Sequence, residues 1–488
     1  MSMIRVENLT FSYPSSADAI FNEVSFQIDT DWKLGFIGGN GRGKTTFMHL
    51  LLGKYEYKGK IISAVPFDYF PFEISDPTQT TGRILSRICP EAQEWELIRE
   101  LSYLKVRDDV LWRSFASLSK GEQTKVLLAA LFLKEEHFLL IDEPTNHLDE
   151  TARRQIAEYL KKKKGFILVS HDRNLLDVCV DHILSLNKTN IEVQKGNFST
   201  RMENFERQQR LEMQQNERLK KEIVRMKGSA RQAEGWSHKV EASKRGAADK
   251  GYVGHKAAKM MKKSKNIEAR REKAVKEKAK LLKNVKSVSN LKIAPAVYHS
   301  NTLVSFSDVA VFYDECAVCQ NVTFDVCRGD RVMLQGKNGS GKSSLLKLIM
   351  KNSIEHTGTI VRGSGLVISY VPQDTSGLQG TLAEYAQLHA LDESLFKTIL
   401  RKMDVERVQF EKNMEDFSAG QKKKVLLAAS LCQPAHLYVW DEPLNYIDVY
   451  SRMQIEQLLL QYAPTMIFVE HDSRFAEKIA TKTVLISS

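Results

Sequence analysis

Two stretches of the chain carry the spacing G-x-x-x-x-G-K-[ST], which is typical of loops that hold the phosphates of a nucleotide. Glycines let backbone N–H groups wrap the phosphates, the lysine neutralises the outer oxygens, and the next hydroxyl can ligate Mg²⁺. The first stretch lies between the apolar run Gly35–Ile37 and the helix-forming run Phe47–Leu52, as a phosphate loop requires. The expected phosphate-binding residues are Gly38, Asn40, Gly41, Gly43, Lys44, Thr45 and Thr46 in the first stretch and Gly336, Asn338, Gly339, Gly341, Lys342, Ser343 and Ser344 in the second.

A pair of carboxylates occurs later in each half of the chain. The apolar run Phe138–Ile141 ends in Asp142-Glu143, and the same pair recurs as Asp441-Glu442. At the end of a buried strand, the aspartate can hold Mg²⁺ through water while the glutamate polarises an attacking water. We therefore expect catalytic roles for the two glutamates. The expected metal ligands from these motifs are Thr45, Asp142, Ser343 and Asp441.

A serine–glycine segment precedes the carboxylates in each half and opens a helix-forming run. This arrangement places a serine hydroxyl and unpaired N–H groups at the start of a helix, where they can face an anion. All these motifs recur in the same order at a nearly constant offset, which indicates an internal duplication. The expected nucleotide-binding residues of these segments are Ser119, Gly121, Glu122, Ser418, Gly420 and Gln421.

The motif set as a whole, which ends in Ser170-His171-Asp172 and Glu470-His471-Asp472, resembles that of ATP-binding cassette ATPases. The resemblance implies that the serine–glycine signature of one half closes over ATP held by the phosphate loop of the other. It further implies that Tyr13 and Tyr313 stack on adenine, and that the two histidines contact the γ-phosphate beside the catalytic glutamates. We therefore expect an ATPase with two composite sites that use ATP and Mg²⁺, and expect ATP to close the halves.

One position departs from that family pattern. The family has a metal-contacting glutamine after its second apolar strand, and the second half provides it as Gln373. The first half has Phe72 at this position, and a phenyl ring cannot ligate Mg²⁺ or position water. We expect the first site to bind ATP but to couple it differently or hydrolyse it slowly, unless water or Gln79 compensates.

The elements that must position these residues are expected to form two domains of α/β class. The prediction is two P-loop ATP-binding cassette domains, residues 1–199 and 299–488, joined by a long α-helical hairpin linker, residues 200–298. With 488 residues and 42% hydrophobic content the chain can bury two or three cores. No apolar run approaches the roughly 18 residues of a spanning helix, so we expect a cytoplasmic protein. Six cysteines are interpreted as reduced structural thiols.

The segment between the two halves carries most of the positive charge. The whole chain has a net charge of +11, whereas residues 201–292 contain 27 Lys and Arg against 11 Asp and Glu. Helix formers predict two antiparallel helices joined by a tip at about residues 233–256. Cationic stems suit a phosphate backbone and exposed rings suit stacking on unpaired bases, although a solvated spacer is the simpler alternative. The expected RNA-contacting tip residues are Trp236, His238, Lys239, Lys244, Arg245, Lys250, Tyr252 and Lys256.

The complete arrangement resembles the ABC-F family, and within it the Lsa-type antibiotic-resistance branch. The matching stretches include Pro144–Asp149, Trp32–Gly35, Gly41–Lys44, Tyr159–Lys164 and Trp440–Tyr446. The resemblance implies a monomer with paired cassettes that binds the ribosome near its exit site. Its linker would reach P-site tRNA and the peptidyl-transferase centre and displace lincosamide, pleuromutilin or streptogramin A drugs, with release on ATP hydrolysis. A housekeeping ABC-F translation factor, a DNA-associated ABC ATPase and a transporter ATPase with a membrane partner are the alternatives.

Overall fold

A computed structural model describes residues 2–14, 19–134, 136–146, 148–186, 190–208, 210, 211, 214, 215, 217, 218, 221, 291–313, 316–351 and 353–486. Contacts divide the chain into two compact units, Met1–Ser199 with Val288–Ser488 and Thr200–Ser287. The first unit contains both cassettes. Residues 198–208 are helical, whereas residues 291–298, the end of the expected helical linker, are described and contain no helix. All eight expected tip residues lie outside the described residues.

The first cassette is built on a six-stranded sheet in the order β5-β6-β7-β3-β8-β9. Its neighbours run parallel except for β8 and β9, which pair antiparallel. The apolar runs of β6 and β7 are buried along their length, as expected for parallel strands that are covered on both faces. The strands are β3 (Lys33–Gly38), β5 (Phe67–Phe70), β6 (Phe138–Asp142), β7 (Phe166–Val169), β8 (His182–Leu186) and β9 (Ile191–Lys195).

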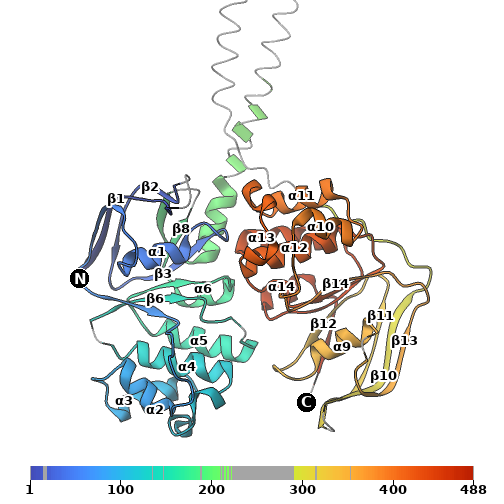
Figure 1. Cartoon of the computed structure of the whole chain (residues 1–488), viewed down its shortest axis with the longest axis horizontal. Helices are drawn as coiled ribbons and strands as arrows, with labels where there is room; N and C mark the ends of the chain where they lie inside the picture. Colours follow the sequence, from blue (N-terminus) through green and yellow to red (C-terminus); the bar gives the residue numbers. More distant parts are fainter. Residues whose placement is uncertain are drawn as a thin grey trace, which may run out of the picture. The chain divides into compact units, whose positions relative to one another are not determined.

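A second, antiparallel sheet in the order β2-β1-β4 completes the layers of this cassette. Helix α1 lies between the two sheets, and Phe47 of this helix packs in one core with Val6 of β1 and Phe36 of β3 (Figure 1). The strands are β1 (Met3–Phe11), β2 (Phe21–Asp29) and β4 (Lys58–Ile62). The helices are α1 (Lys44–Leu51), α2 (Thr81–Ile88), α3 (Glu94–Tyr103), α4 (Lys120–Leu131), α5 (Glu150–Lys161) and α6 (Arg173–Cys179).

The second cassette repeats this plan. Its main sheet has five parallel strands in the order β14-β15-β16-β12-β17, and its antiparallel sheet has the order β11-β10-β13. The strands are β10 (Thr302–Tyr313), β11 (Cys316–Cys327), β12 (Arg331–Gln335), β13 (His356–Arg362), β14 (Ile368–Val371), β15 (Leu437–Asp441), β16 (Met466–Val469) and β17 (Lys482–Leu485). The helices are α9 (Lys342–Ile349), α10 (Leu382–Leu388), α11 (Glu393–Lys402), α12 (Ala419–Cys432), α13 (Val449–Tyr462) and α14 (Ser473–Ile479).

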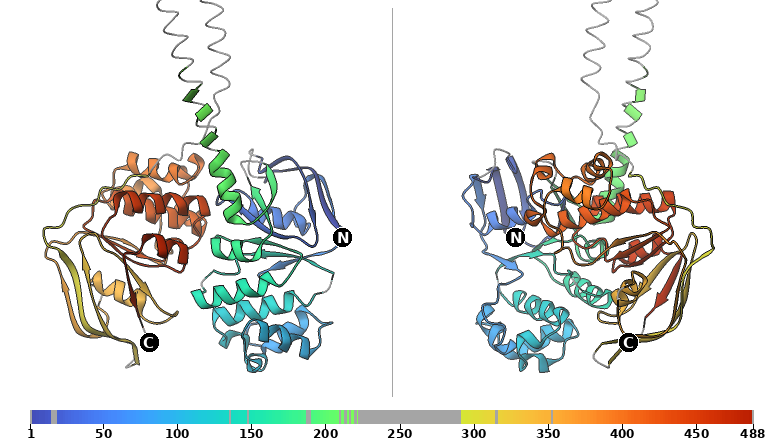
Figure 2. Two further views of the ribbon diagram at one scale, coloured as in Figure 1. Left: turned by 180° about the vertical axis from the view of Figure 1, so that it is seen from behind. Right: turned by 45° about the vertical axis from the view of Figure 1, so that its right-hand side comes forward.

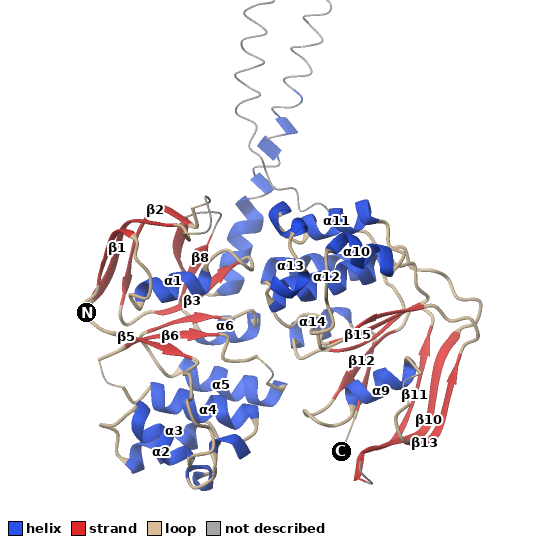
Figure 3. Cartoon of the chain, viewed as in Figure 1, coloured by secondary structure: helices blue, strands red, loops and turns tan. Residues whose placement is uncertain are grey.

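The duplication expected from the motifs is therefore also a duplication of layers. In each cassette the antiparallel strands, blue in the first and yellow in the second, form a layer of their own (Figure 2). The phosphate loop joins β3 to α1 in the first cassette and β12 to α9 in the second (Figure 3). The carboxylate pairs begin at the last residues of β6 and β15. The expected α/β class with two cassettes is confirmed.

Candidate active sites

The two phosphate loops have the same local structure. Gly43 and Gly341 cap their helices with φ angles of 103° and 83°, in the left-handed region that favours glycine. A Cβ at Gly43 would also lie 2.5 Å from the side chain of Ile20, so the first loop has no space for a larger residue. Lys44 Nζ donates to the carbonyl oxygens of Gly38 (2.9 Å) and Gly39 (3.1 Å). Lys342 Nζ does the same with Gly336 (2.9 Å) and Lys337 (2.7 Å).

Each loop places its hydroxyl beside the aspartate that ends β6 or β15, a strand separated by one other strand from the strand before the loop. Thr45 Oγ1 donates to Asp142 Oδ2 (2.9 Å), and Ser343 hydrogen-bonds to Asp441. Burial raises the pKa of Asp441, and its Oδ1 is a buried atom without a hydrogen-bond partner in the described part of the chain. A hydroxyl, a carboxylate and an unsatisfied carboxylate oxygen are ligands that fit Mg²⁺. The expected hydroxyl and carboxylate lie side by side in both loops, and their role as Mg²⁺ ligands stays a prediction.

The two expected catalytic glutamates differ in their surroundings. Both have positive φ angles, 48° for Glu143 and 46° for Glu442, and both face a histidine: His171 Nε2 lies 3.4 Å from Glu143 Oε1, and His471 Nε2 lies 3.6 Å from Glu442 Oε1. Burial, together with the charge of Asp142, raises the pKa of Glu143 to about 8. Burial also acts to raise the pKa of Glu442, but interactions with His471 and nearby groups hold that pKa below its ordinary value. At neutral pH the second glutamate is therefore the more fully ionised of the two.

Two groups stabilise the ionised form of Glu442 and have no counterpart in the first cassette. Gln373 hydrogen-bonds to Glu442, whereas the first cassette has Phe72. Lys423 is buried below the site, where its Nζ donates to the carbonyl oxygens of Pro372 (2.8 Å) and Asp441 (3.1 Å). The first cassette has Thr124 at that position. Lys423 was missed by sequence reasoning, and the only signal for it is this difference between the two copies.

Gln79 was considered as a replacement for the missing glutamine of the first site. Its side-chain Nε2 donates to Asp76 Oδ2 (2.9 Å), so a loop carboxylate already holds this amide. The Phe72 ring instead lies 5.3 Å from Lys134 Nζ. These contacts give the first site no amide that takes the role of Gln373.

A cavity of about 440 Å³ surrounds the second phosphate loop. Apart from Val318, every residue that lines this cavity is one for which the sequence predicts a role in nucleotide binding, metal binding or catalysis. These residues are Tyr313, Asn338, Gly339, Gly341, Lys342, Ser343, Ser344, Gln373 and Glu442. The hydroxyl of Tyr313 hydrogen-bonds to Ser344 Oγ (3.0 Å), and that of Tyr13 hydrogen-bonds to Thr46 Oγ1 (2.9 Å). Both rings are thereby held beside a phosphate loop, where stacking on adenine remains a prediction.

The serine–glycine segments begin helices α4 and α12 with capping boxes. Ser119 Oγ accepts from Glu122 N (3.2 Å), and Glu122 Oε2 accepts from Ser119 N (2.8 Å). Ser418 and Gln421 exchange the corresponding bonds at 3.3 and 2.9 Å. Glu122 and Gln421 thus shape the helix start, and Ser119 Oγ also donates to Glu122 Oε2 (2.8 Å). A role of the serine hydroxyls in binding an anion stays a prediction.

The first phosphate loop contacts the signature helix of the second cassette directly. Asn40 Nδ2 donates to the carbonyl oxygen of Tyr446, and a Cβ added to Gly420 would lie 2.4 Å from Asn40 Nδ2. The guanidinium of Arg42 pairs with both carboxylate oxygens of Asp404, at 2.8 and 2.7 Å. These contacts form the composite arrangement expected for the first site.

Among the described residues, Gly121 in the second site is packed more loosely than Gly420 in the first. A Cβ added to Gly121 would meet only Ser119 and Leu148 of its own cassette within 4 Å. Gln335 Nε2 donates to Glu150 Oε2 (3.1 Å), and Asp149 is one of the charges that act on Lys342. The two composite sites are therefore unequal, because the first is closed by packing while the second has the better-equipped glutamate.

Outside these sites the described residues show no further metal-binding chemistry. All six cysteines are free thiols, including Cys316 and Cys319. Within the described residues, no group of three or more His, Cys, Asp or Glu side chains is arranged to hold a metal ion. The described helices also include none that is long and apolar enough to cross a membrane.

Comparisons with known proteins agree with this geometry. The sequence profile of the ABC transporter family matches residues 21–146 and 319–445. The chain is 28% identical to the ribosome protection protein VmlR of Bacillus subtilis, covering 98% of this chain and 86% of VmlR. It is 24% identical to ABC transporter F family member 2 of Arabidopsis thaliana, covering 99% of this chain and 76% of that protein.

Solved structures show the same fold. The archaeal ribosome recycling factor aABCE1, solved with the ribosomal stalk protein aP1, aligns with a TM-score of 0.64 at 18% identity, covering 99% of this chain and 87% of that one. The RNase-L inhibitor aligns with a TM-score of 0.62, also at 18% identity, covering 99% and 88% of the two chains. Two matched cassettes with the motifs of ATP hydrolysis, and relatives aligned over nearly the whole chain, establish that the protein belongs to the ATP-binding cassette family and, within it, to the ABC-F ATPases.

Proposed function

We propose that the protein binds ribosomes when ATP closes its cassettes, inserts its basic linker beside P-site tRNA, and displaces antibiotics from the peptidyl-transferase centre. The drugs proposed are lincosamides, pleuromutilins and streptogramin A. The observation that carries the proposal is the packing of Gly420 and Tyr446 of the second cassette against Asn40 in the first phosphate loop. ATP held in that loop would contact both cassettes, so its binding energy would stabilise the closed state.

The roles proposed for the site residues follow from their contacts. Bound Mg²⁺ would neutralise phosphate charge and hold the β- and γ-phosphate oxygens in place. In the second site, Ser343 and Asp441 would hold the ion, and Gln373 stands beside them in the cavity. Glu442 would accept a proton from the attacking water, because Lys423 and its other neighbours keep it ionised. Hydrolysis would weaken the closed state and release the protein.

The partner proposed for the linker is RNA. Residues 201–292 combine 27 cationic side chains with two aromatic residues in the predicted tip, Trp236 and Tyr252, a composition suited to phosphates and unpaired bases. We place the linker at residues 200–298, with its tip at about 233–256, in a cytoplasmic protein associated with ribosomes. Similarity over 98% of the chain to a protein named for ribosome protection supports this assignment.

A panel of minimum inhibitory concentrations tests the proposal. A susceptible host would express the full chain, a form with residues 233–256 replaced by a short Gly-Ser loop, and a form with both Glu143→Gln and Glu442→Gln. We expect the full chain alone to raise resistance to the three drug classes. We expect the double glutamine form to sediment with ribosomes in ATP, because it can close but cannot hydrolyse.

The outcomes separate the alternatives. Unchanged drug susceptibility together with ATP-dependent ribosome binding would indicate a housekeeping ABC-F factor. Competition by DNA for the ribosome-bound form would favour a DNA-associated ATPase. Full resistance from the form without the tip would refute the proposed role of the linker.

A further inference from the structure

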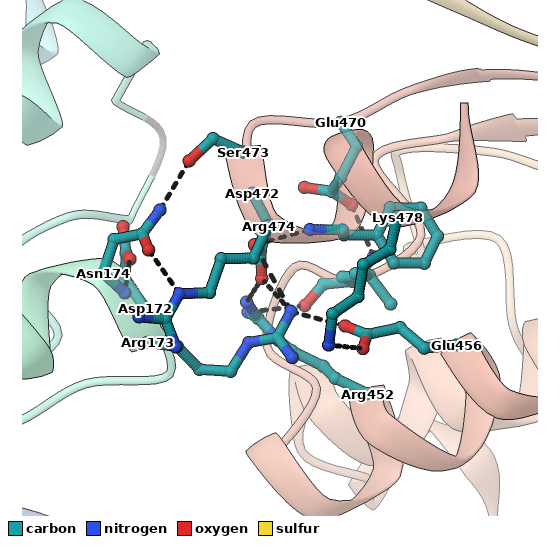
Figure 4. A network of polar contacts seen from close by, with 12 residues as sticks. Asp172, Arg173, Asn174, Arg452, Glu456, Glu470, Asp472, Ser473, Arg474 and Lys478 are labelled. Carbon is teal, nitrogen blue, oxygen red and sulfur yellow. Dashed lines mark hydrogen bonds and ion pairs between the residues drawn. The ribbon is translucent and has the colours of Figure 1, made fainter. Parts of the chain in front are cut away.

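The loops that carry His171 and His471 are joined across the cassettes by buried ion pairs. Arg173, the first residue of α6, stands two positions after His171 of the first cassette. Asp472, which caps α14 in the second cassette, stands directly after His471. Figure 4 shows the Arg173 side chain reaching from the first cassette into a group of second-cassette residues. The contact therefore lies where the two histidine loops could influence each other.

The partners of Arg173 belong to the other cassette. Its Nη2 forms an ion pair with Glu456 Oε1 and lies 3.2 Å from Asp472 Oδ2. All three side chains are buried, and a buried guanidinium without a carboxylate is strongly unfavourable. Because both carboxylates come from the second cassette, Arg173 is paired only when the cassettes are together.

Asp472 links Arg173 to residues near both ATP sites, because it follows His471 directly and also pairs with Arg452. Its Oδ2 lies 3.2 Å from Arg452. Arg452 in turn donates to the carbonyl oxygens of Leu444 and Ile447, both at 2.9 Å. These two residues flank Tyr446, whose carbonyl oxygen accepts from Asn40 in the first phosphate loop. Polar contacts thus run from Asp472 through Arg452 to the backbone on either side of Tyr446, and the backbone of Tyr446 contacts the first phosphate loop.

The duplicated position in the first cassette is built differently. Asp172 pairs with Arg153 of its own cassette at 3.6 Å, as Asp472 pairs with Arg452. The residue that corresponds to Arg173 is Ser473, which accepts a hydrogen bond from Asn174 and carries no charge. Only the second site's aspartate therefore receives an arginine across the interface from this position.

We propose that Arg173 is a positioning residue for ATP hydrolysis at the second site, supplied by the first cassette. By holding Asp472 and Arg452, it keeps His471 aligned with Glu442 only while the cassettes are closed. Closure around ATP in the first site thereby licenses hydrolysis in the second site. At the position that corresponds to Arg173 the second cassette supplies Ser473, and its own cation across the interface, Arg474, pairs with Asp177 instead of Asp172.

The test uses the full-length chain carrying Glu143→Gln, so that turnover reports the second site. Initial rates of phosphate release would be measured against MgATP concentration for Arg173→Ala, Arg173→Lys and Arg474→Ala. The last is a matched control, because Arg474 also pairs across the interface, with Asp177, but does not contact Asp472. We expect Arg173→Ala to lower kcat about tenfold, equivalent to about 1.4 kcal/mol, with KM changed by less than about threefold.

The other variants separate positioning from general interface packing. We expect Arg173→Lys to recover much of kcat, because it restores the cation, and Arg474→Ala to keep kcat within about twofold of its parent. Equal losses of kcat in Arg173→Ala and Arg474→Ala, or a change confined to KM, would overturn the proposal.

A further variant removes the burden of an unpaired buried charge. Arg173→Met with Glu456→Gln deletes both charges of that pair, and we expect it to recover the melting temperature lost in Arg173→Ala. If kcat stays low while the melting temperature recovers, the positioning role stands. If kcat recovers as well, Arg173 only compensates Glu456, and the proposal is wrong.

Discussion

The unequal glutamates predict different pH profiles for the two ATP sites. The perturbation is a pair of single variants: Glu442→Gln leaves the first site's glutamate in place, and Glu143→Gln leaves the second's. Burial raises the pKa of Glu143 to about 8, so only about a tenth of this carboxyl is ionised at pH 7 and about nine tenths at pH 9. A general base acts in its ionised form, so turnover at the first site should rise about tenfold over this range.

The second site should behave differently because the pKa of Glu442 lies below its ordinary value. That carboxyl is ionised throughout the range from pH 6 to 9, and turnover in Glu143→Gln should be nearly constant. The histidine that faces Glu143 does not titrate between pH 7 and 9, so it does not account for the expected rise of first-site turnover with pH. Burial holds the pKa of His171 well below its usual value, so this histidine stays neutral over the range.

The assay is steady-state phosphate release at saturating MgATP in buffers of constant ionic strength, with a melting curve at each pH to exclude unfolding. A flat profile for Glu442→Gln between pH 6.5 and 9 would refute the reasoning. Parallel slopes in both variants would also refute it, because they would assign the titration to a group common to both sites.

Two further predictions follow from the packing. Gly420→Ala should lower first-site turnover about tenfold or more in the Glu442→Gln chain, because the added methyl would lie 2.4 Å from Asn40 Nδ2. The matched control is Gly121→Ala in the Glu143→Gln chain, which should change second-site turnover little because the nearest neighbour of the added methyl lies at 3.7 Å. Similar effects of the two substitutions would contradict this account. Lys423→Met should lower the free energy of unfolding by about 2–4 kcal/mol in urea titrations, because it leaves the carbonyl oxygens of Pro372 and Asp441 without their donor. The control Thr124→Met, at the corresponding position of the first cassette, should lower that free energy clearly less. Equal losses would show that the hydrogen bonds of the lysine contribute little.

The motifs were predictable because their chemistry depends on short-range spacing. Lys44 and its loop, Asp142 and the capping serines all act within a few residues of a strand or helix end, so the sequence places them without knowledge of the fold. The two cassettes followed from the repetition of the same motifs. The contrast between Phe72 and Gln373 was likewise readable, because it is a difference between aligned copies.

Residues that act through long-range packing were not predictable. The run Lys422-Lys423-Lys424 has the composition of a solvated helix face, yet Lys423 and Lys424 are buried, and Lys424 Nζ lies 2.7 Å from Asp448 Oδ2. Arg173 likewise has no local signal in the sequence. Its carboxylate partners lie about 300 residues away, in the other copy of the duplicated cassette. Which signature segment packs against which phosphate loop also depends on the assembled cassettes.

The unequal sites support a division of roles between the two cassettes. The first site has tight contacts from the other cassette but a glutamate that is largely protonated at pH 7, which suits prolonged retention of ATP. The second site has an ionised glutamate backed by Lys423 but looser contacts around Gly121. Arg173 links the two, since the cation that holds the second histidine loop is present only when the first site's cassette is docked. We infer that the first site sets how long the closed state persists, and that the second site hydrolyses ATP once closure is complete.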